Sequence, residues 1–198
     1  MPVVGKRFRD ALVWAAELHE DQNRKGGTVP YVAHLLGVVS IVLEHGGSED
    51  TAIAALLHDA LEDQAHKMSE GEIRARFGEA VERMVVECSD GTPEEQQDRS
   101  HDRWFARKKK YIADIAGKSE GALMVSMADK LHNVRSMLED YRAQGESLWE
   151  RFTTGREGNL WYYGAMVDAY EKRVGRTRLW GELARTVSEL RNLVEAAR

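Results

Sequence analysis

Four ionisable side chains directly follow an apolar run in AALLHDALEDQ, residues 54–64: His58, Asp59, Glu62 and Asp63. A carboxylate at the buried end of a helix needs a neutralising partner, because an unpaired charge that leaves water costs several kcal/mol. Imidazole nitrogen and carboxylate oxygen are both good ligands for divalent transition metals. The adjacent histidine and aspartate therefore indicate part of a metal site.

Two further residues could complete this site. His34 precedes the apolar run LLGVVSIVL, and Asp129 follows ALMVSMA, so each lies at the edge of a separate buried segment. A lone histidine there is more often a core residue, and Asp129 could instead pair with Lys130 or Arg135. The conjunction favours one divalent metal ion held by two nitrogens and two oxygens, with positions left open for water or substrate. The predicted ligands are His34, His58, Asp59 and Asp129.

The two acids after the His-Asp pair have two interpretations. Residues four apart share a helix face, so Glu62 is expected above His58, and Asp63 above Asp59. Glu62 could then act as general base towards a water near the metal, and Asp63 could hold that water or a ligand in place. Alternatively, both acids lie at an exposed helix end and are merely solvated.

The elements that must position these residues are predicted to be helices. Apolar residues recur at three- and four-residue spacing, and no segment alternates convincingly at period two, so we expect an all-α fold. Ser69 and Glu72 fit a capping box, and Gly78 is placed to end that helix. Further helices are predicted over 79–88, about 98–116, 120–142, 157–173 and 177–197, with loops at 23–30, 44–50, 89–98 and 153–159.

Composition limits the classes of partner. The 198 residues carry a net charge of −5, which argues against a surface built for DNA or RNA. No run approaches the roughly 18 apolar residues of a membrane span, and the N-terminus does not resemble a signal peptide. With a single cysteine, Cys88, predicted buried and inert, no internal disulfide is possible. These features predict a cytoplasmic protein with no membrane partner.

The remaining histidines and the basic segment have ordinary explanations. The histidines in or beside polar segments are predicted at the surface; they are His19, His45, His66 and His101. The basic run RWFARKKKY is typical of a solvated helix face. The amphipathic C-terminal segment could dock on the domain or pair with another subunit, which leaves monomer and homodimer open.

Four segments resemble a known family in order and spacing: RKGGTVPYVAHLLGV, AALLHDALED, IRARFGEAVERMV and MADKLHNVRSM. They are similar to the hydrolase domain of RelA/SpoT-type enzymes, within the HD superfamily of metal-dependent phosphohydrolases. The resemblance covers about residues 8–140. It implies one helical HD-type bundle over 1–198 with a central metal site, in which the C-terminal helices, 157–198, complete or extend the motif-bearing core.

The resemblance also implies roles for individual residues. The four ligands match a site that usually holds Mn²⁺, and Glu62 and Asp63 match the pair that orients and activates the attacking water. Positions expected to bind substrate match a basic pair for guanine and phosphates, an asparagine near the ribose, an arginine and an aromatic against the nucleotide, and lysines for the pyrophosphate. They are, in that order, Arg24, Lys25, Asn133, Arg156, Tyr162, Lys108 and Lys109.

The function that the resemblance implies is removal of the 3′-pyrophosphate from (p)ppGpp, or from a related phosphorylated nucleotide, by attack of a metal-bound water. The segment 88–110 departs from the family pattern, which keeps open an HD-type nucleotidase acting on phosphomonoesters. A non-catalytic nucleotide-binding module is a third alternative, against which the intact ligand set and Glu62 argue.

Overall fold

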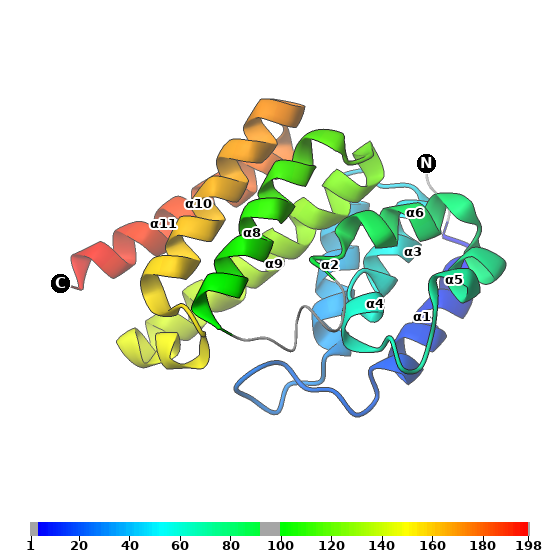
Figure 1. Cartoon of the computed structure of the whole chain (residues 1–198), viewed down its shortest axis with the longest axis horizontal. Helices are drawn as coiled ribbons and strands as arrows, with labels where there is room; N and C mark the ends of the chain where they lie inside the picture. The colour runs from blue at the N-terminus through cyan, green and yellow to red at the C-terminus, as the bar shows by residue number, and fades with distance from the viewer. Residues whose placement is uncertain (1–3, 92–99, 198) are drawn as a thin grey trace. The chain divides into compact units, whose positions relative to one another are not determined.

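The computed structural model describes residues 4–91 and 100–197 (Figure 1). Within these ranges the chain forms helices joined by loops, and the only β-type pairing is an isolated bridge between Asn23 and Pro30. The all-α prediction is confirmed. The described chain divides into two compact units, one comprising 4–91 with 118–128 and the other 100–117 with 129–197. A single domain over 1–198 stays a prediction.

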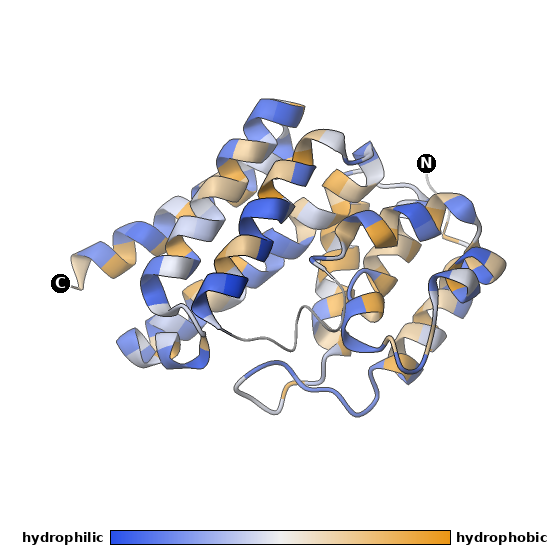
Figure 2. Cartoon of the chain, viewed as in Figure 1, coloured by the Kyte–Doolittle hydropathy of each residue, from blue (hydrophilic) through white to orange (hydrophobic). Residues whose placement is uncertain are grey.

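Helix α3 (Glu49–Leu57) forms the centre of the first unit. It packs against α1 (Lys6–Leu18), α2 (Val32–Glu44) and α6 (Glu79–Cys88). Every residue from Thr51 to Leu57 is buried, as expected of a helix that is apolar on all sides. Figure 2 shows the same hydrophobic character along α2 and α3. This central helix therefore delivers its C-terminal end, and the polar residues that follow, to the inside of the unit.

Local capping signals set several helix boundaries. The Ser48 side chain accepts a hydrogen bond from the Thr51 N–H and so begins α3. The predicted capping box is confirmed at the start of α5 (Glu70–Phe77), where the Ser69 N–H donates to Glu72 Oε2 at 2.9 Å. Gly78, with φ of 90°, separates α5 from α6.

The helix that carries the His-Asp pair differs from the expectation of one continuous helix. Helix α3 ends at Leu57, and a short α4 (Ala60–Asp63) begins after Asp59. Asp59 has ψ of −3°, and its carbonyl accepts hydrogen bonds from the backbone N–H groups of both Glu62 and Asp63. A new helix thus begins after Asp59. The turn at 58–59 replaces the single helix on which Glu62 was expected above His58 and Asp63 above Asp59.

The second unit is organised around α10 (Gly155–Val174), which packs against α8 (His101–Asp114), α11 (Arg178–Ala196) and the 3-10 helices η1 (Ile115–Gly117) and η2 (Gly145–Arg151). The long α9 (Glu120–Gln144) contributes residues 120–128 to the first unit and 129–144 to the second. The helices expected over 120–142, 157–173 and 177–197 are confirmed to within a few residues. Most of the predicted loop 89–98 and the start of the helix predicted at 98 lie outside the described residues.

The C-terminal helix docks on its own unit. Its buried stripe faces α10, and the Trp180 indole N–H donates to the Val167 carbonyl at 3.0 Å. Arg135 and Arg142 of α9 form ion pairs with Glu182 and Glu189 of α11. Docking of this amphipathic segment on the domain is therefore observed, and pairing with another subunit stays a prediction. No described helix combines the length and apolar composition that a membrane span requires.

Candidate metal centre

Two histidines and an aspartate meet at the end of the central helix. His34 lies in the first turn of α2, His58 caps α3, and Asp59 follows it. One potential ligand atom from each lies within 4.8 Å of the others. The Asp59 Oδ2 atom is 3.1 Å from His58 Nε2 and 3.6 Å from His34 Nε2. Both histidines are almost fully buried, at 1% and 3% exposure, whereas Asp59 is half-buried. Three of the four predicted ligands thus form one cluster.

Neighbouring groups hold these side chains in orientation. His58 Nδ1 lies 2.8 Å from the Ala55 carbonyl oxygen, so the proton belongs on Nδ1 and the Nε2 lone pair faces Asp59. The Tyr31 hydroxyl donates a hydrogen bond to Asp59 Oδ2. Hydrogen bonds that orient the ligand side chains are typical of metal sites in proteins. Two imidazole nitrogens and a carboxylate oxygen suit a divalent transition metal, so these residues fit such an ion.

The fourth predicted ligand, Asp129, belongs to the second unit. It is 6% exposed, and both Lys130 Nζ and Asn133 Nδ2 donate to its carboxylate. Burial is the largest single influence on Lys130 and lowers its pKa, but the Asp129 charge together with Tyr162, Tyr111 and Tyr170 holds the pKa of the ammonium well above its usual value. The pairing with Lys130 that the sequence allowed is therefore present. Ligation by Asp129 stays a prediction.

The two acids of α4 both have protein partners. Glu62 is half-buried and its Oε1 accepts a hydrogen bond from the backbone N–H of Asp90. Asp63 Oδ2 accepts from Gln22 Nε2 at 2.7 Å. Although Asp63 is exposed by surface area, partial loss of water around its carboxyl group and the nearby Asp59 charge raise its pKa. Neither acid is merely solvated.

The predicted basic pair lies in the loop between α1 and α2. The Arg24 N–H donates to the Val29 carbonyl at 2.8 Å, and Gly26, with φ of 81°, turns the chain. Arg24 is half-buried and Lys25 is exposed. This loop begins beside Gln22, which donates to Asp63, and ends at Tyr31, which donates to Asp59.

The second unit brings together some of the other predicted residues. Lys108 Nζ lies 4.9 Å from the centre of the buried Tyr162 ring, in a cation–π contact. Lys109 is exposed, as expected of a solvated helix face. Arg156 pairs with Glu146 at 3.4 Å. Asn133 Nδ2 donates to Asp129 Oδ1. A role for each in substrate binding stays a prediction.

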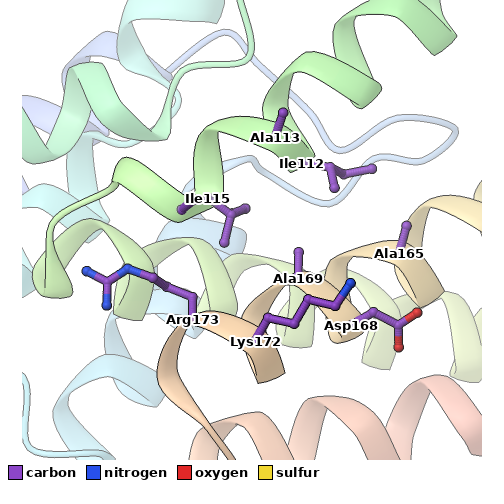
Figure 3. Close-up of a pocket in the computed structure, with 9 residues that line it drawn as sticks. Ile112, Ala113, Ile115, Ala165, Asp168, Ala169, Lys172 and Arg173 are labelled. Carbon is purple, nitrogen blue, oxygen red and sulfur yellow. The ribbon is translucent and has the colours of Figure 1, made fainter.

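A separate cavity of about 420 Å³ lies in the second unit, between the end of α8 with η1 and one face of α10 (Figure 3). Its walls are mainly isoleucine and alanine, and Asp168, Lys172 and Arg173 supply the charged groups. None of the predicted site residues lines it.

The surface prediction for His19 is wrong. Its side chain is 2% exposed, because the chain after α1 folds back and the imidazole ring stacks on Tyr31, with the ring centres 5.0 Å apart. His45 is half-buried, while His66 and His101 are exposed as expected. The sequence analysis also missed Gln22 and Tyr31. The only local signal is the short polar segment HEDQN, which contains Gln22 but not Tyr31.

The helical fold and the clustered His, His and Asp side chains define a member of the HD-domain family. The family model described as "HD domain" matches residues 11–159, and the chain belongs to this family.

The curated relatives come from animals and bacteria. The chain is 37% identical over 131 residues to guanosine-3′,5′-bis(diphosphate) 3′-pyrophosphohydrolase MESH1 of Xenopus tropicalis, covering 65% of this chain and 68% of that protein. The human MESH1 protein is 36% identical over 132 residues, again covering 65% and 68%. The bifunctional (p)ppGpp synthase/hydrolase SpoT of Escherichia coli is 29% identical over 134 residues, which span 67% of this chain and 18% of SpoT.

The fold is also similar to solved structures. A structure described as a metazoan ortholog of SpoT that hydrolyses ppGpp matches with a TM-score of 0.75 and 27% identity, over 96% of this chain and 98% of that one. The lmo0812 protein of Listeria monocytogenes matches with a TM-score of 0.67 and 27% identity, over 82% and 99%.

Proposed function

We propose that this protein is a metal-dependent phosphohydrolase that removes pyrophosphate from the 3′ position of (p)ppGpp. The observation that carries the proposal is the grouping within one unit of the His34–His58–Asp59 cluster with two further carboxylates, Glu62 and Asp63, each held by a hydrogen bond from the protein. Relatives named as ppGpp 3′-pyrophosphohydrolases support the same substrate.

The proposed metal is one divalent ion, Mn²⁺, held by the clustered residues together with Asp129. When bound, such an ion polarises a phosphoryl oxygen and lowers the pKa of a coordinated water. The tautomer of His58 suits this role, because its Nδ1–H donates to the Ala55 carbonyl and its Nε2 keeps a lone pair for the ion. The Tyr31 hydroxyl donates to Asp59 Oδ2 and so helps to hold the orientation of this carboxylate.

Glu62 is the proposed general base. The Asp90 N–H anchors its carboxylate, and an ionised carboxylate has about four lone-pair sites, so this bond leaves capacity for the proton of an attacking water. The water oxygen bonds to the phosphorus attached to the ribose 3′-oxygen, and the bond between that oxygen and phosphorus breaks. The proton that Glu62 accepts passes to the leaving 3′-oxygen. The products from ppGpp are GDP and pyrophosphate.

Substrate recognition is proposed for local cationic groups, since the chain as a whole is acidic. Arg24 and Lys25 are placed on a tight loop, where a guanidinium fork and an ammonium suit phosphate and guanine oxygens. In the second unit, Lys108 beside Tyr162 offers a cation and an aromatic face together. Further contacts are proposed for Lys109, Asn133 and Arg156.

The experiment is a substrate panel with product identification. The purified protein is incubated with Mn²⁺ and ppGpp, pppGpp, GTP, dNTPs or nucleoside monophosphates, alongside Asp59→Ala and a control, Asp10→Ala, at an exposed aspartate of α1. We expect pyrophosphate from ppGpp and pppGpp alone, no turnover by Asp59→Ala, and full turnover by the control. Orthophosphate from monophosphates with ppGpp untouched would overturn the substrate assignment in favour of a nucleotidase.

A further inference from the structure

His19 is a buried histidine that the proposed chemistry does not use. It follows the last residue of α1, is 2% exposed, and lies in the unit that carries the candidate metal cluster. Its Nδ1 is 2.6 Å from Gln22 Oε1. Its Nε2 is buried and has no hydrogen-bond partner among the residues that the structure describes. A polar ring that is buried and only half satisfied needs a reason to be there.

The Gln22 amide accepts hydrogen bonds at its oxygen and donates one from its nitrogen. Gln64 Nε2 donates to Gln22 Oε1 at 2.7 Å, and His19 Nδ1 is directed at the same oxygen. Because the amide oxygen receives both donors, the amide NH₂ group must point the other way. Gln22 Nε2 indeed donates to Asp63 Oδ2 at 2.7 Å. His19 and Gln64 therefore hold the Gln22 amide in the orientation that presents its NH₂ group to the Asp63 carboxylate, which can only accept when ionised.

The protonation state of His19 agrees with this direction. To bond with the Gln22 oxygen, Nδ1 must carry the proton, and a neutral imidazole then has none on the buried Nε2. Burial lowers the pKa of His19, which favours this neutral form. The ring thus acts as a fixed donor to Gln22.

A second contact leads from the same ring to the metal cluster. The His19 and Tyr31 rings stack with centres 5.0 Å apart and planes at 19°. The Tyr31 hydroxyl donates to Asp59 Oδ2. The backbone joins the two paths, since the Tyr31 N–H donates to the Gln22 carbonyl at 2.9 Å. The buried His19 side chain therefore contacts both Gln22, which donates to Asp63, and Tyr31, which donates to Asp59.

We propose that His19 is a positioning residue that orients two carboxylates of the active site: Asp63 through the Gln22 amide, and Asp59 through the stacked Tyr31 ring. The roles of Asp63 and Asp59 rest on the proposed function. Two substitutions distinguish the two paths. His19→Phe keeps the ring stack on Tyr31 and removes the hydrogen-bond donor to Gln22, whereas His19→Ala removes both.

The test compares three variants. His19→Phe is expected to lower kcat for ppGpp about 10–100-fold, the usual loss on removal of such a supporting bond, with KM and Mn²⁺ affinity unchanged. His19→Asn, whose amide N–H replaces Nδ1–H, is expected to recover most of kcat. His19→Ala is expected to lose both kcat and Mn²⁺ affinity, the latter also about 10–100-fold, measured by electron paramagnetic resonance titration without substrate.

Controls separate positioning from folding. His45→Asn changes another histidine of the same unit whose Nδ1 bonds to a carbonyl, at the end of α2, and should leave kcat and Mn²⁺ affinity unchanged. Gln22→Met removes the amide and should reproduce the kcat loss of His19→Phe. The double variant should be no worse than either, because both act on one chain of bonds.

The outcomes are decisive for each path. Wild-type kcat in His19→Phe, or equal losses in the Phe and Asn variants, would overturn the path to Asp63. Wild-type Mn²⁺ affinity in His19→Ala would overturn the path to Asp59. If the wild-type protein released no pyrophosphate from ppGpp, the proposed function would fail, and the metal titration would still test the second path.

Discussion

Replacing Glu62 by glutamine isolates proton transfer from every other role of this side chain. The Asp90 N–H donates to the Glu62 carboxylate, and an amide oxygen can accept the same hydrogen bond. An amide cannot accept the proton of an attacking water. General-base catalysis contributes about 10²–10⁴-fold, so Glu62→Gln should raise the activation barrier by about 3–5.5 kcal/mol. Stability should fall by only about 1 kcal/mol, the difference between a charge-assisted and a neutral hydrogen bond.

The assay is single-turnover hydrolysis of ppGpp by rapid quench at saturating Mn²⁺, with Mn²⁺ affinity measured in parallel. The matched control is Glu44→Gln in α2, an exposed glutamate whose carboxylate also accepts a hydrogen bond, from Ser40 Oγ at 2.8 Å. We expect the control to match the wild type and Glu62→Gln to lose only the chemical step. An unchanged single-turnover rate would refute the general-base role. A parallel loss of Mn²⁺ affinity would show instead that Glu62 helps to bind the ion.

Three further predictions concern the Tyr31 hydrogen bond, the burial of His19 and the packing of two glycines. Tyr31→Phe removes the donor to Asp59 and should weaken Mn²⁺ binding about 10–100-fold, as measured by calorimetry. An unchanged affinity would show that this hydrogen bond does not stabilise metal binding. Burial lowers the pKa of His19 below 6.5, so the unfolded chain binds the proton more readily and the free energy of unfolding decreases as pH falls below 6.5. Urea unfolding of the metal-free protein should therefore show a smaller decrease from pH 7 to 5 in His19→Phe than in the wild type. Equal decreases in the two proteins would refute this. Gly47→Ala should lose about 1–3 kcal/mol in urea, because its Cβ would lie 2.4 Å from a valine side chain, whereas Gly117→Ala, with nothing within 4 Å, should be nearly neutral.

The features that the sequence predicted well have local causes. A capping box needs only Ser69 and Glu72, three residues apart, and Gly78 marks a backbone angle that other residues rarely adopt. The meeting of His34 with His58 and Asp59 was also predictable, because each lies at the edge of a buried apolar run.

The features that it missed depend on contacts between distant segments. The bond from Gln22 to Asp63 joins residues 41 apart, and nothing in either segment's periodicity indicates it. The burial of His19 follows from the return of the chain to Tyr31 after a loop, and the polar residues around it favoured an exposed position. At the turn at 58–59, a new helix begins with two N–H groups bonded to the Asp59 carbonyl, and an apolar pattern does not indicate this restart.

The most direct test of the account is hydrolysis of ppGpp by the Mn²⁺-loaded protein in ¹⁸O-labelled water, with the products identified by mass spectrometry. The account predicts intact pyrophosphate carrying one labelled oxygen, together with unlabelled GDP, because water attacks phosphorus and the ribose oxygen leaves. Release of orthophosphate, or label in the nucleotide, would contradict it.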